Sequence, residues 1–156
     1  MPIKLLKTGS KAPDIKSKDQ DGNPFELKSL RGSKVVLYFY PKDDTSGCTA
    51  EACNLRDNYH DLLKKGVKVI GVSKDDEASH RKFIEKYSLP FPLLADIGLG
   101  VVKEYGVWGD KQNYGRTYKG IHRVTYLINE KGVIDHVISK VKTGEHAEQI
   151  MELWGM

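Results

Sequence analysis

The segment KVVLYFY, residues 34–40, contains the longest apolar run of the chain, and it indicates the fold class. Its β-branched and aromatic side chains, without polar alternation, predict a strand that is covered on both faces. A second run of this kind, GVKVIGVS at 66–73, follows a stretch with helical spacing at about 47–65. Two buried strands joined by a helix are typical of a parallel α/β unit with a right-handed crossover.

The remaining segments continue this alternation. They predict, in order, a helix at 75–89, an extended piece at 90–96, a brief helix at 98–105, a hairpin of 122–129 with 133–139, and a last helix at 144–154. Before the first strand, residues 15–30 predict a small hairpin that turns at Asp21 and Gly22. We therefore expect an α/β fold, a thioredoxin-like three-layer sandwich with a central mixed sheet and an N-terminal β-hairpin, as a single domain over 1–156.

The composition excludes several classes of protein. With 29% charged and 39% hydrophobic residues, the chain of 156 residues has the balance of a globular domain. Its longest apolar stretch is far short of the roughly 20 residues of a membrane span, so we expect no membrane partner. The start MPIKLLKTGSKAP lacks the apolar block of a signal peptide, which predicts a cytoplasmic protein. The net charge of +4 is scattered along the chain, which weighs against nucleic acid as a partner.

The two cysteines, Cys48 and Cys53, lie just beyond the first buried strand. In a reducing compartment they are not expected to form a merely structural bridge, so inert core thiols, metal ligands and redox groups remain open. On a helix over 47–65, Cys48 begins the apolar stripe and Cys53 lies about 140° around the axis, on the polar face. The stripe continues through Ala52, Leu55, Tyr59 and Leu62.

The predicted position of Cys48 in the first turn of a helix bears on its reactivity. The positive end of the helix dipole and the free N–H groups there favour a thiolate, which is the nucleophilic form of cysteine. Most free cysteines are instead small buried hydrophobic residues. Helix position alone leaves these two interpretations equally open.

The residues around Cys48 resemble a known family. Pro41, Thr45 and Cys48 fit the motif P-x-x-x-T-x-x-C of the peroxiredoxins, and YFYPKDDTSGCTAEAC resembles the Q-type subgroup, also called bacterioferritin comigratory proteins. The likeness extends through GVSKD, FPLLAD, YGVW and GIHRVTYLIN, and so covers most of the chain. Ser46 departs from the pattern because many relatives carry proline there. A serine hydroxyl can cap a helix, so we expect the helix to start at this point.

The resemblance implies a role for each motif residue. Cys48 becomes the peroxidatic cysteine, whose thiolate attacks a peroxide oxygen and is converted to a sulfenic acid. The hydroxyl of Thr45 lies against the thiolate and the peroxide, or else it is an ordinary helix cap. Pro41 shields the thiolate from water. Arg123, in a later strand, pairs with the thiolate and the polarised peroxide, or else it reaches solvent at a strand end.

The resemblance also implies how the cycle closes. Cys53 is the resolving cysteine, which forms an intramolecular disulfide with Cys48 that a thioredoxin-like reductant then reduces. The alternative is that Cys53 is a thiol that takes no part in the reaction. Glu51 joins the hydrogen-bond network of the site or serves only the helix dipole. The implied enzyme reduces hydrogen peroxide and organic hydroperoxides as a monomer, without a cofactor or metal.

Other functions stay in view at this point. The five histidines (His60, His80, His122, His136 and His146) show no ligand spacing, which argues against a metal site. A cysteine hydrolase would need one of them beside Cys48. A thioredoxin-type oxidoreductase would carry C-x-x-C, whereas this chain has C-x-x-x-x-C. A peroxide-sensing redox switch would bind a partner without sustained turnover.

Overall fold

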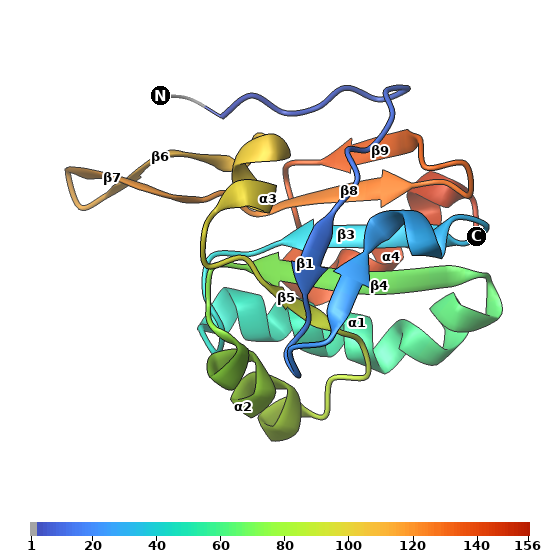
Figure 1. Cartoon of the computed structure of the whole chain (residues 1–156), viewed down its shortest axis with the longest axis horizontal. Coiled ribbons are helices and arrows are strands. Elements are labelled where there is room, and N and C mark those ends of the chain that lie inside the picture. Colours follow the sequence, from blue (N-terminus) through green and yellow to red (C-terminus); the bar gives the residue numbers. More distant parts are fainter. Residues whose placement is uncertain (1–2) are drawn as a thin grey trace.

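A five-stranded mixed sheet forms the centre of the molecule in the computed structural model, which describes residues 3–156 (Figure 1). The strands β5, β4 and β3 are parallel to one another, and β8 and β9 continue the sheet in antiparallel fashion. In sheet order they are β5 (Leu93–Ala95), β4 (Val67–Ser73), β3 (Lys34–Phe39), β8 (Val124–Ile128) and β9 (Ile134–Ile138). This is the mixed sheet that the sequence predicts.

Helices cover both faces of the sheet and give the three layers. One face carries α1 (Ser46–Lys64), α2 (Glu77–Tyr87) and α4 (His146–Trp154), and the other carries α3 (Gly100–Glu104), the hairpin of β1 (Lys16–Lys18) and β2 (Pro24–Glu26), and the short helix η1 (Leu27–Leu30). The side chains of β3 alternate between the two resulting cores, with Val36 and Tyr38 on the first and Val35 and Leu37 on the second. Both faces of this strand are buried, which explains its continuous apolar sequence.

The predicted elements are present, with small differences at their ends. The helix predicted at 47–65 runs from Ser46 to Lys64, and a short helix η2 (Thr143–Glu145) precedes α4. The N-terminal hairpin turns at Gly22, whose φ of 77° lies in the left-handed region. The prediction that Arg123 lies within a strand is wrong, because β8 begins one residue later, at Val124. No helix among residues 3–156 is long and apolar enough to span a bilayer.

One hairpin was not predicted. The strands β6 (Trp108–Asn113) and β7 (Arg116–Ile121) pair with each other outside the main sheet and project from the body of the molecule (Figure 1). The turn residues Tyr114 and Gly115 have φ values of 52° and 77°. Two positive φ values in a two-residue loop are typical of the tight turns that match strand twist.

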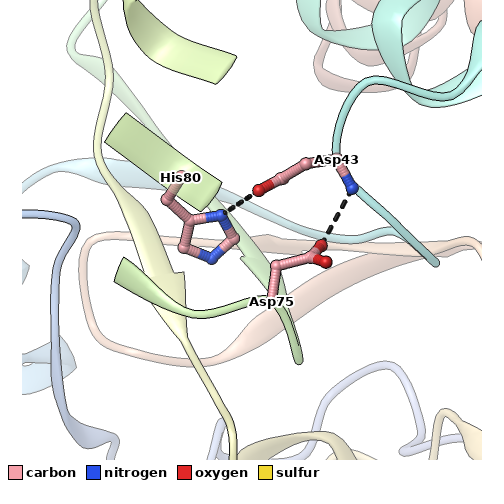
Figure 2. Close-up of side chains that lie close together, drawn as sticks. All are labelled: Asp43, Asp75 and His80. Carbon is pink, nitrogen blue, oxygen red and sulfur yellow. Dashed lines mark hydrogen bonds and ion pairs between the residues drawn. The ribbon is translucent and has the colours of Figure 1, made fainter. Parts of the chain in front are cut away.

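The parallel arrangement of β3 and β4 brings the two connections that follow these strands together. Both strands end at the same edge of the sheet, so the β3–α1 and β4–α2 connections are neighbours. They are joined directly, because the backbone N–H of Asp43 donates to Oδ2 of Asp75 at 2.8 Å (Figure 2). Cys48 follows on the first turn of α1, immediately beyond this junction.

Candidate active site

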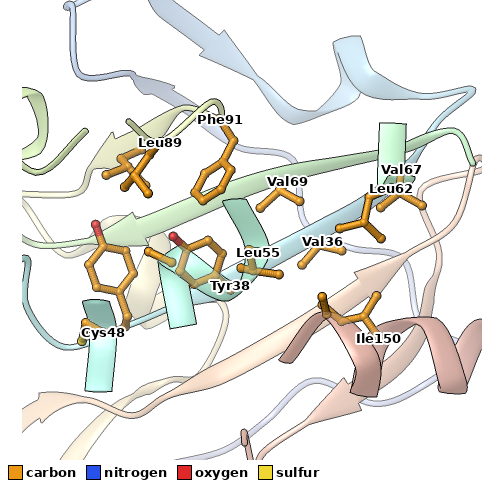
Figure 3. Packing of buried hydrophobic residues seen from close by; sticks show 14 of the residues in the cluster. Val36, Tyr38, Cys48, Leu55, Leu62, Val67, Val69, Leu89, Phe91 and Ile150 are labelled. Carbon is orange, nitrogen blue, oxygen red and sulfur yellow. The ribbon is translucent and has the colours of Figure 1, made fainter. Parts of the chain in front are cut away.

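Cys48 is buried at the start of helix α1, at one end of the core beneath that helix (Figure 3). It is the third residue of α1, and only 1% of its surface is exposed. Cys53 is half-buried, and both thiols are free. The helical spacing therefore predicts correctly that one thiol faces the core and the other is more exposed.

Arg123 provides the positive charge that faces Cys48. The pairing of β3 with β8 sets Val124 opposite Phe39, so Arg123 lies beside the end of β3 from which the Cys48 loop departs. Its Nη2 lies 3.4 Å from Sγ of Cys48. A Cβ at Gly47 would stand 3.0 Å from Nη2, so the glycine leaves room for this approach. Cys48 therefore accepts a charge-assisted hydrogen bond from a planar donor group.

Burial disfavours the charged form of Arg123. The attraction of the neighbouring Cys48 and Glu51 for the guanidinium more than offsets this effect of burial. Together they raise the pKa of the guanidinium above its ordinary value. The side chain is 22% exposed, so it bridges the interior and the surface. Arg123 is thus a permanent cation between two acidic groups.

Glu51, on the next turn of α1, is the second partner of Arg123. Its Oε1 accepts from Nη1 of Arg123 at 2.8 Å. The carboxyl is fully buried, and this desolvation raises its pKa to about 7 although Arg123 works in the opposite direction. Its Oε2 makes no hydrogen bond within residues 3–156 and lies 3.5 Å from Nε2 of His146. A substantial fraction of Glu51 is therefore neutral near pH 7.

His146 and Thr125 complete the buried side of the site, and sequence reasoning missed both. Burial lowers the pKa of His146 to about 4, so the ring is neutral at pH 7. Its Nδ1 donates to Oε1 of Gln149 at 3.0 Å, and the Thr125 hydroxyl lies 2.8 Å from Nε2. No motif or spacing links residues of β8 and α4 to Cys48, so only the folded chain reveals them.

Pro41 and Thr45 lie in the connection that leads to Cys48. Pro41 is half-buried directly after Tyr40, and Thr45 is the extended N-cap residue of α1. The hydroxyl of Thr45 donates to the carbonyl of Lys42 at 2.8 Å and makes no capping bond. Within residues 3–156, no hydrogen bond joins Thr45 to Cys48. The helix starts at Ser46 as predicted, but Ser46 is its first residue and not its cap, because the N-cap residue is Thr45.

Comparison with known proteins establishes the family. A model of the AhpC/TSA family matches residues 8–137, so the chain belongs to this family. A putative peroxiredoxin bcp of Coxiella burnetii is 48% identical over 146 residues, which are 94% of this chain and 97% of that protein. Peroxiredoxin Bcp of Escherichia coli K12 is 44% identical over 94% of each chain.

Solved structures agree with these relatives. A structure of peroxiredoxin Q from Xanthomonas campestris matches with a TM-score of 0.84 and 32% identity over 90% of each chain. A structure of PrxQ from Xylella fastidiosa matches with a TM-score of 0.91 and 27% identity over 97% of each chain. Within its family, this chain is a peroxiredoxin of the Q-type, or bacterioferritin comigratory protein, subgroup. The predicted resemblance and the thioredoxin-like fold are confirmed.

Proposed function

We propose that this peroxiredoxin reduces hydrogen peroxide and organic hydroperoxides with Cys48 as its nucleophile. The observation that carries the proposal is the 3.4 Å contact between Sγ of Cys48 and Nη2 of Arg123, at the N-terminus of a helix. The guanidinium and the positive end of the helix dipole both lie beside the sulfur that acts as the nucleophile. The alkyl peroxide reduction activity named for the Xanthomonas campestris relative supports the substrate class.

In the first step, the thiolate of Cys48 attacks one peroxide oxygen. An S–O bond forms while the O–O bond breaks, and the departing oxygen takes a proton from water and leaves as water or an alcohol. The donors of Arg123 stabilise the charge that moves from sulfur to oxygen. Because the hydroxyl of Thr45 donates to Lys42, its lone pairs remain to accept the O–H of the peroxide. Pro41 contributes by keeping water from the thiolate.

The protonation state of Glu51 assists this step. A neutral carboxyl still accepts a hydrogen bond from Arg123, but it does not compete with the thiolate for the positive charge. Burial favours the neutral form, as the raised pKa of about 7 indicates. Glu51 thus orients the guanidinium and leaves its charge to Cys48.

In the second step, Cys53 attacks the sulfenic acid of Cys48, which gives a disulfide and water. Five residues along an ideal helix separate two Cα atoms by roughly 8.7 Å, whereas a disulfide tolerates about 7 Å at most. The first turns of α1 therefore unwind before this bond forms. A thioredoxin-type dithiol then reduces the disulfide by exchange. Since both cysteines belong to one chain, a monomer can complete the cycle.

The test is a coupled peroxidase assay with thioredoxin, its reductase and NADPH. Wild type is expected to turn over many peroxides per chain, and Cys48→Ser none. Cys53→Ser is expected to form one sulfenic acid per chain, to over-oxidise, and to stop. Sustained thioredoxin-dependent turnover by Cys53→Ser would remove its resolving role. A wild type that stops near one peroxide per chain would instead identify a peroxide sensor.

A further inference from the structure

Three polar residues form a compact cluster (Figure 2), and one of them, Asp43, belongs to the segment between Pro41 and Thr45. Asp43 comes from the β3–α1 connection, Asp75 from the β4–α2 connection, and His80 from helix α2. One ligand-type atom from each lies within 4.8 Å of the others. We call Asp43, Asp75 and His80 the anchor cluster. The mechanism described above uses none of them.

The anchor cluster has the composition of a metal site, but its atoms are committed to hydrogen bonds within the protein. Nε2 of His80 lies 2.9 Å from the carbonyl of Leu94, and Nδ1 lies 2.7 Å from Oδ2 of Asp43. Nε2 is hydrogen-bonded to a carbonyl and Nδ1 to a carboxyl oxygen, so neither ring nitrogen keeps a lone pair free for a metal. Oδ1 of Asp43 accepts from the hydroxyl of Tyr40 at 2.6 Å.

The contact between Asp43 and His80 is buried. Their side chains are 4% and 0% exposed. The hydroxyl of Ser79 donates to Oδ2 of Asp43 at 2.8 Å, so this carboxylate accepts from three side chains. A buried carboxylate with this many donors has one favourable position. The pair therefore fixes Asp43 relative to helix α2.

The peptide unit between Lys42 and Asp43 connects the anchor cluster to the active site. Its N–H donates to Oδ2 of Asp75 at 2.8 Å. Its C=O accepts from Oγ1 of Thr45 at 2.8 Å. Because a peptide unit is planar, the direction of the N–H also sets that of the C=O. The carboxylate of Asp75 therefore controls where the Thr45 hydroxyl points its proton.

We propose that the anchor cluster positions the Thr45 hydroxyl for catalysis through the Lys42–Asp43 peptide. This inference rests on the proposed function, in which Cys48 is the nucleophile. With its proton directed to Lys42, Oγ1 of Thr45 presents only lone pairs to the peroxide and holds the peroxide O–H for attack. Asp75 and His80 act through Thr45, so they are positioning residues.

Asp44 ties the same segment to helix α2 a second time. Its φ of 57° is left-handed, and its carboxylate accepts from Nζ of Lys86 and from the hydroxyl of Tyr87, both at 2.8 Å. Loss of one contact in the anchor cluster therefore leaves the segment attached. The expected effect is a reoriented peptide, which kinetics can separate from unfolding.

A double-mutant cycle of Asp75→Ala and Thr45→Val tests the proposal. The readout is the rate constant for oxidation of reduced Cys48 by hydrogen peroxide in a single turnover, followed by quenching with an alkylating agent. Loss of the hydroxyl in Thr45→Val is expected to slow oxidation about 100-fold, and Asp75→Ala about 10-fold. Because Asp75 acts through Thr45, the double variant is expected to be no slower than Thr45→Val alone.

Losses that multiply in the double variant, or a wild-type rate for Asp75→Ala, would overturn the proposal. The same experiment includes Cys48→Ser. Peroxide consumption by Cys48→Ser would refute the proposed function itself. Oxidation of wild type at Cys48 together with multiplying losses would refute only the positioning role.

Two substitutions of His80 provide a matched second test. The amide nitrogen of asparagine is attached at Cγ, as Nδ1 is in histidine, so His80→Asn keeps a donor toward Asp43. His80→Gln places its nitrogen near the position of Nε2, toward Leu94, and loses Asp43. We expect oxidation of Cys48 to be within a few-fold of wild type in His80→Asn and about 10-fold slower in His80→Gln. Thermal unfolding is measured for both, and equal rates in two folded variants would contradict the proposal.

Discussion

At the residue scale, the site depends on one guanidinium, which donates hydrogen bonds to two acidic groups. Arg123 donates through Nη2 to Cys48 and through Nη1 to Glu51, at 3.4 and 2.8 Å. Two donors of one planar group reach two partners without any change of rotamer. An ammonium group offers a single nitrogen and cannot reproduce this geometry.

Arg123→Lys is therefore expected to lose activity although the charge is kept. Each lost hydrogen bond to the transition state costs on the order of tenfold to a thousandfold in rate. The measurement is the rate constant of Cys48 oxidation by hydrogen peroxide. Arg81→Lys is the matched control, because Arg81 is exposed and donates to the carbonyl of Gln20, away from the site. A near wild-type rate for Arg123→Lys would leave Arg123 as a strand-end residue.

The buried carboxyl of Glu51 predicts a pH-dependent stability. Its pKa is raised from 4.5 to about 7 by burial, so between these values the folded state holds a proton that the unfolded state releases. The stabilisation is complete below pH 4.5 and is lost as the pH rises toward 7. The shift corresponds to about 3 kcal/mol. Glu51→Gln removes this titration and keeps the shape of the side chain.

Denaturant unfolding of reduced protein measures the effect from pH 4.5 to 7.5. Relative to Glu51→Gln, the protein with Glu51 is expected to lose up to about 3 kcal/mol as the pH rises, and to level off above pH 7. Both proteins carry Cys48→Ser, which removes the thiol. His146, whose pKa is lowered to about 4, titrates in both and largely cancels from the difference. Parallel pH profiles would show that Glu51 is ionised throughout.

The sequence predicted only the part of the site that a local motif carries. Pro41, Thr45 and Cys48 share one segment, and Arg123 came from the family resemblance. From the sequence, His146 and His80 were candidates only for metal ligands or for the base of a cysteine hydrolase. Their roles arise from packing between elements far apart in the chain, which no spacing in one sequence encodes.

At the element scale, apolar pattern decided which strands could be predicted. The strands β3, β4 and β8 are buried on both faces, and their continuous apolar runs identify them. The strands β6 and β7 lie outside the sheet and have mostly polar sequences, so neither an apolar run nor a clear alternation was present. Their turn is Tyr114–Gly115 rather than the common Asn-Gly or Asp-Gly.

Helix α1 is the element that must change during the proposed cycle. Cys48 and Cys53 both lie inside Ser46–Lys64, where an ideal helix keeps their Cα atoms too far apart for a disulfide. Small residues at Gly47 and Ala50 bury little surface, which limits the cost of local opening in this part of the helix. The unwinding also removes Cys48 from Arg123 and disassembles the site until the thiols are restored.

Hydrogen exchange is expected to report this unwinding. Amides from about 47 to 56 should exchange faster in the oxidised form than in the reduced form, while those of β4 stay protected in both. Cys53→Ser treated with one equivalent of peroxide is the control, because it cannot form the disulfide. The oxidised wild type should weigh two mass units less than the reduced wild type, and it should remain monomeric on a non-reducing gel. Equal protection in both forms, or a disulfide-linked dimer as the main product, would contradict the mechanism.

At the scale of the whole molecule, the proposed disulfide between Cys48 and Cys53 opposes the packing of the fold. The central sheet contributes to both cores and does not depend on the first turns of α1. Those turns bury Cys48 and Ala52 against the sheet and hold Glu51 on Arg123. Oxidation replaces these contacts with one covalent bond that closes a very short loop. A short loop gains little from cross-linking, since the stabilisation grows with loop length.

The oxidised protein is therefore expected to be less stable than the reduced protein, the reverse of the usual effect of a disulfide. Lost burial of Cys48 and Ala52 costs about 2 kcal/mol. At about pH 5, where Glu51 is neutral, its lost hydrogen bond to a charged group costs about 2 kcal/mol more. Closure of the short loop returns about 2 kcal/mol. The net loss of about 2 kcal/mol corresponds to a Tm lower by about 4–8 °C for a chain of this size. Calorimetry of both redox forms at about pH 5 measures this change in Tm, with Cys53→Ser as the protein in which peroxide produces no such shift. An oxidised form as stable as the reduced one would mean that the first turns of α1 stay packed when the disulfide forms.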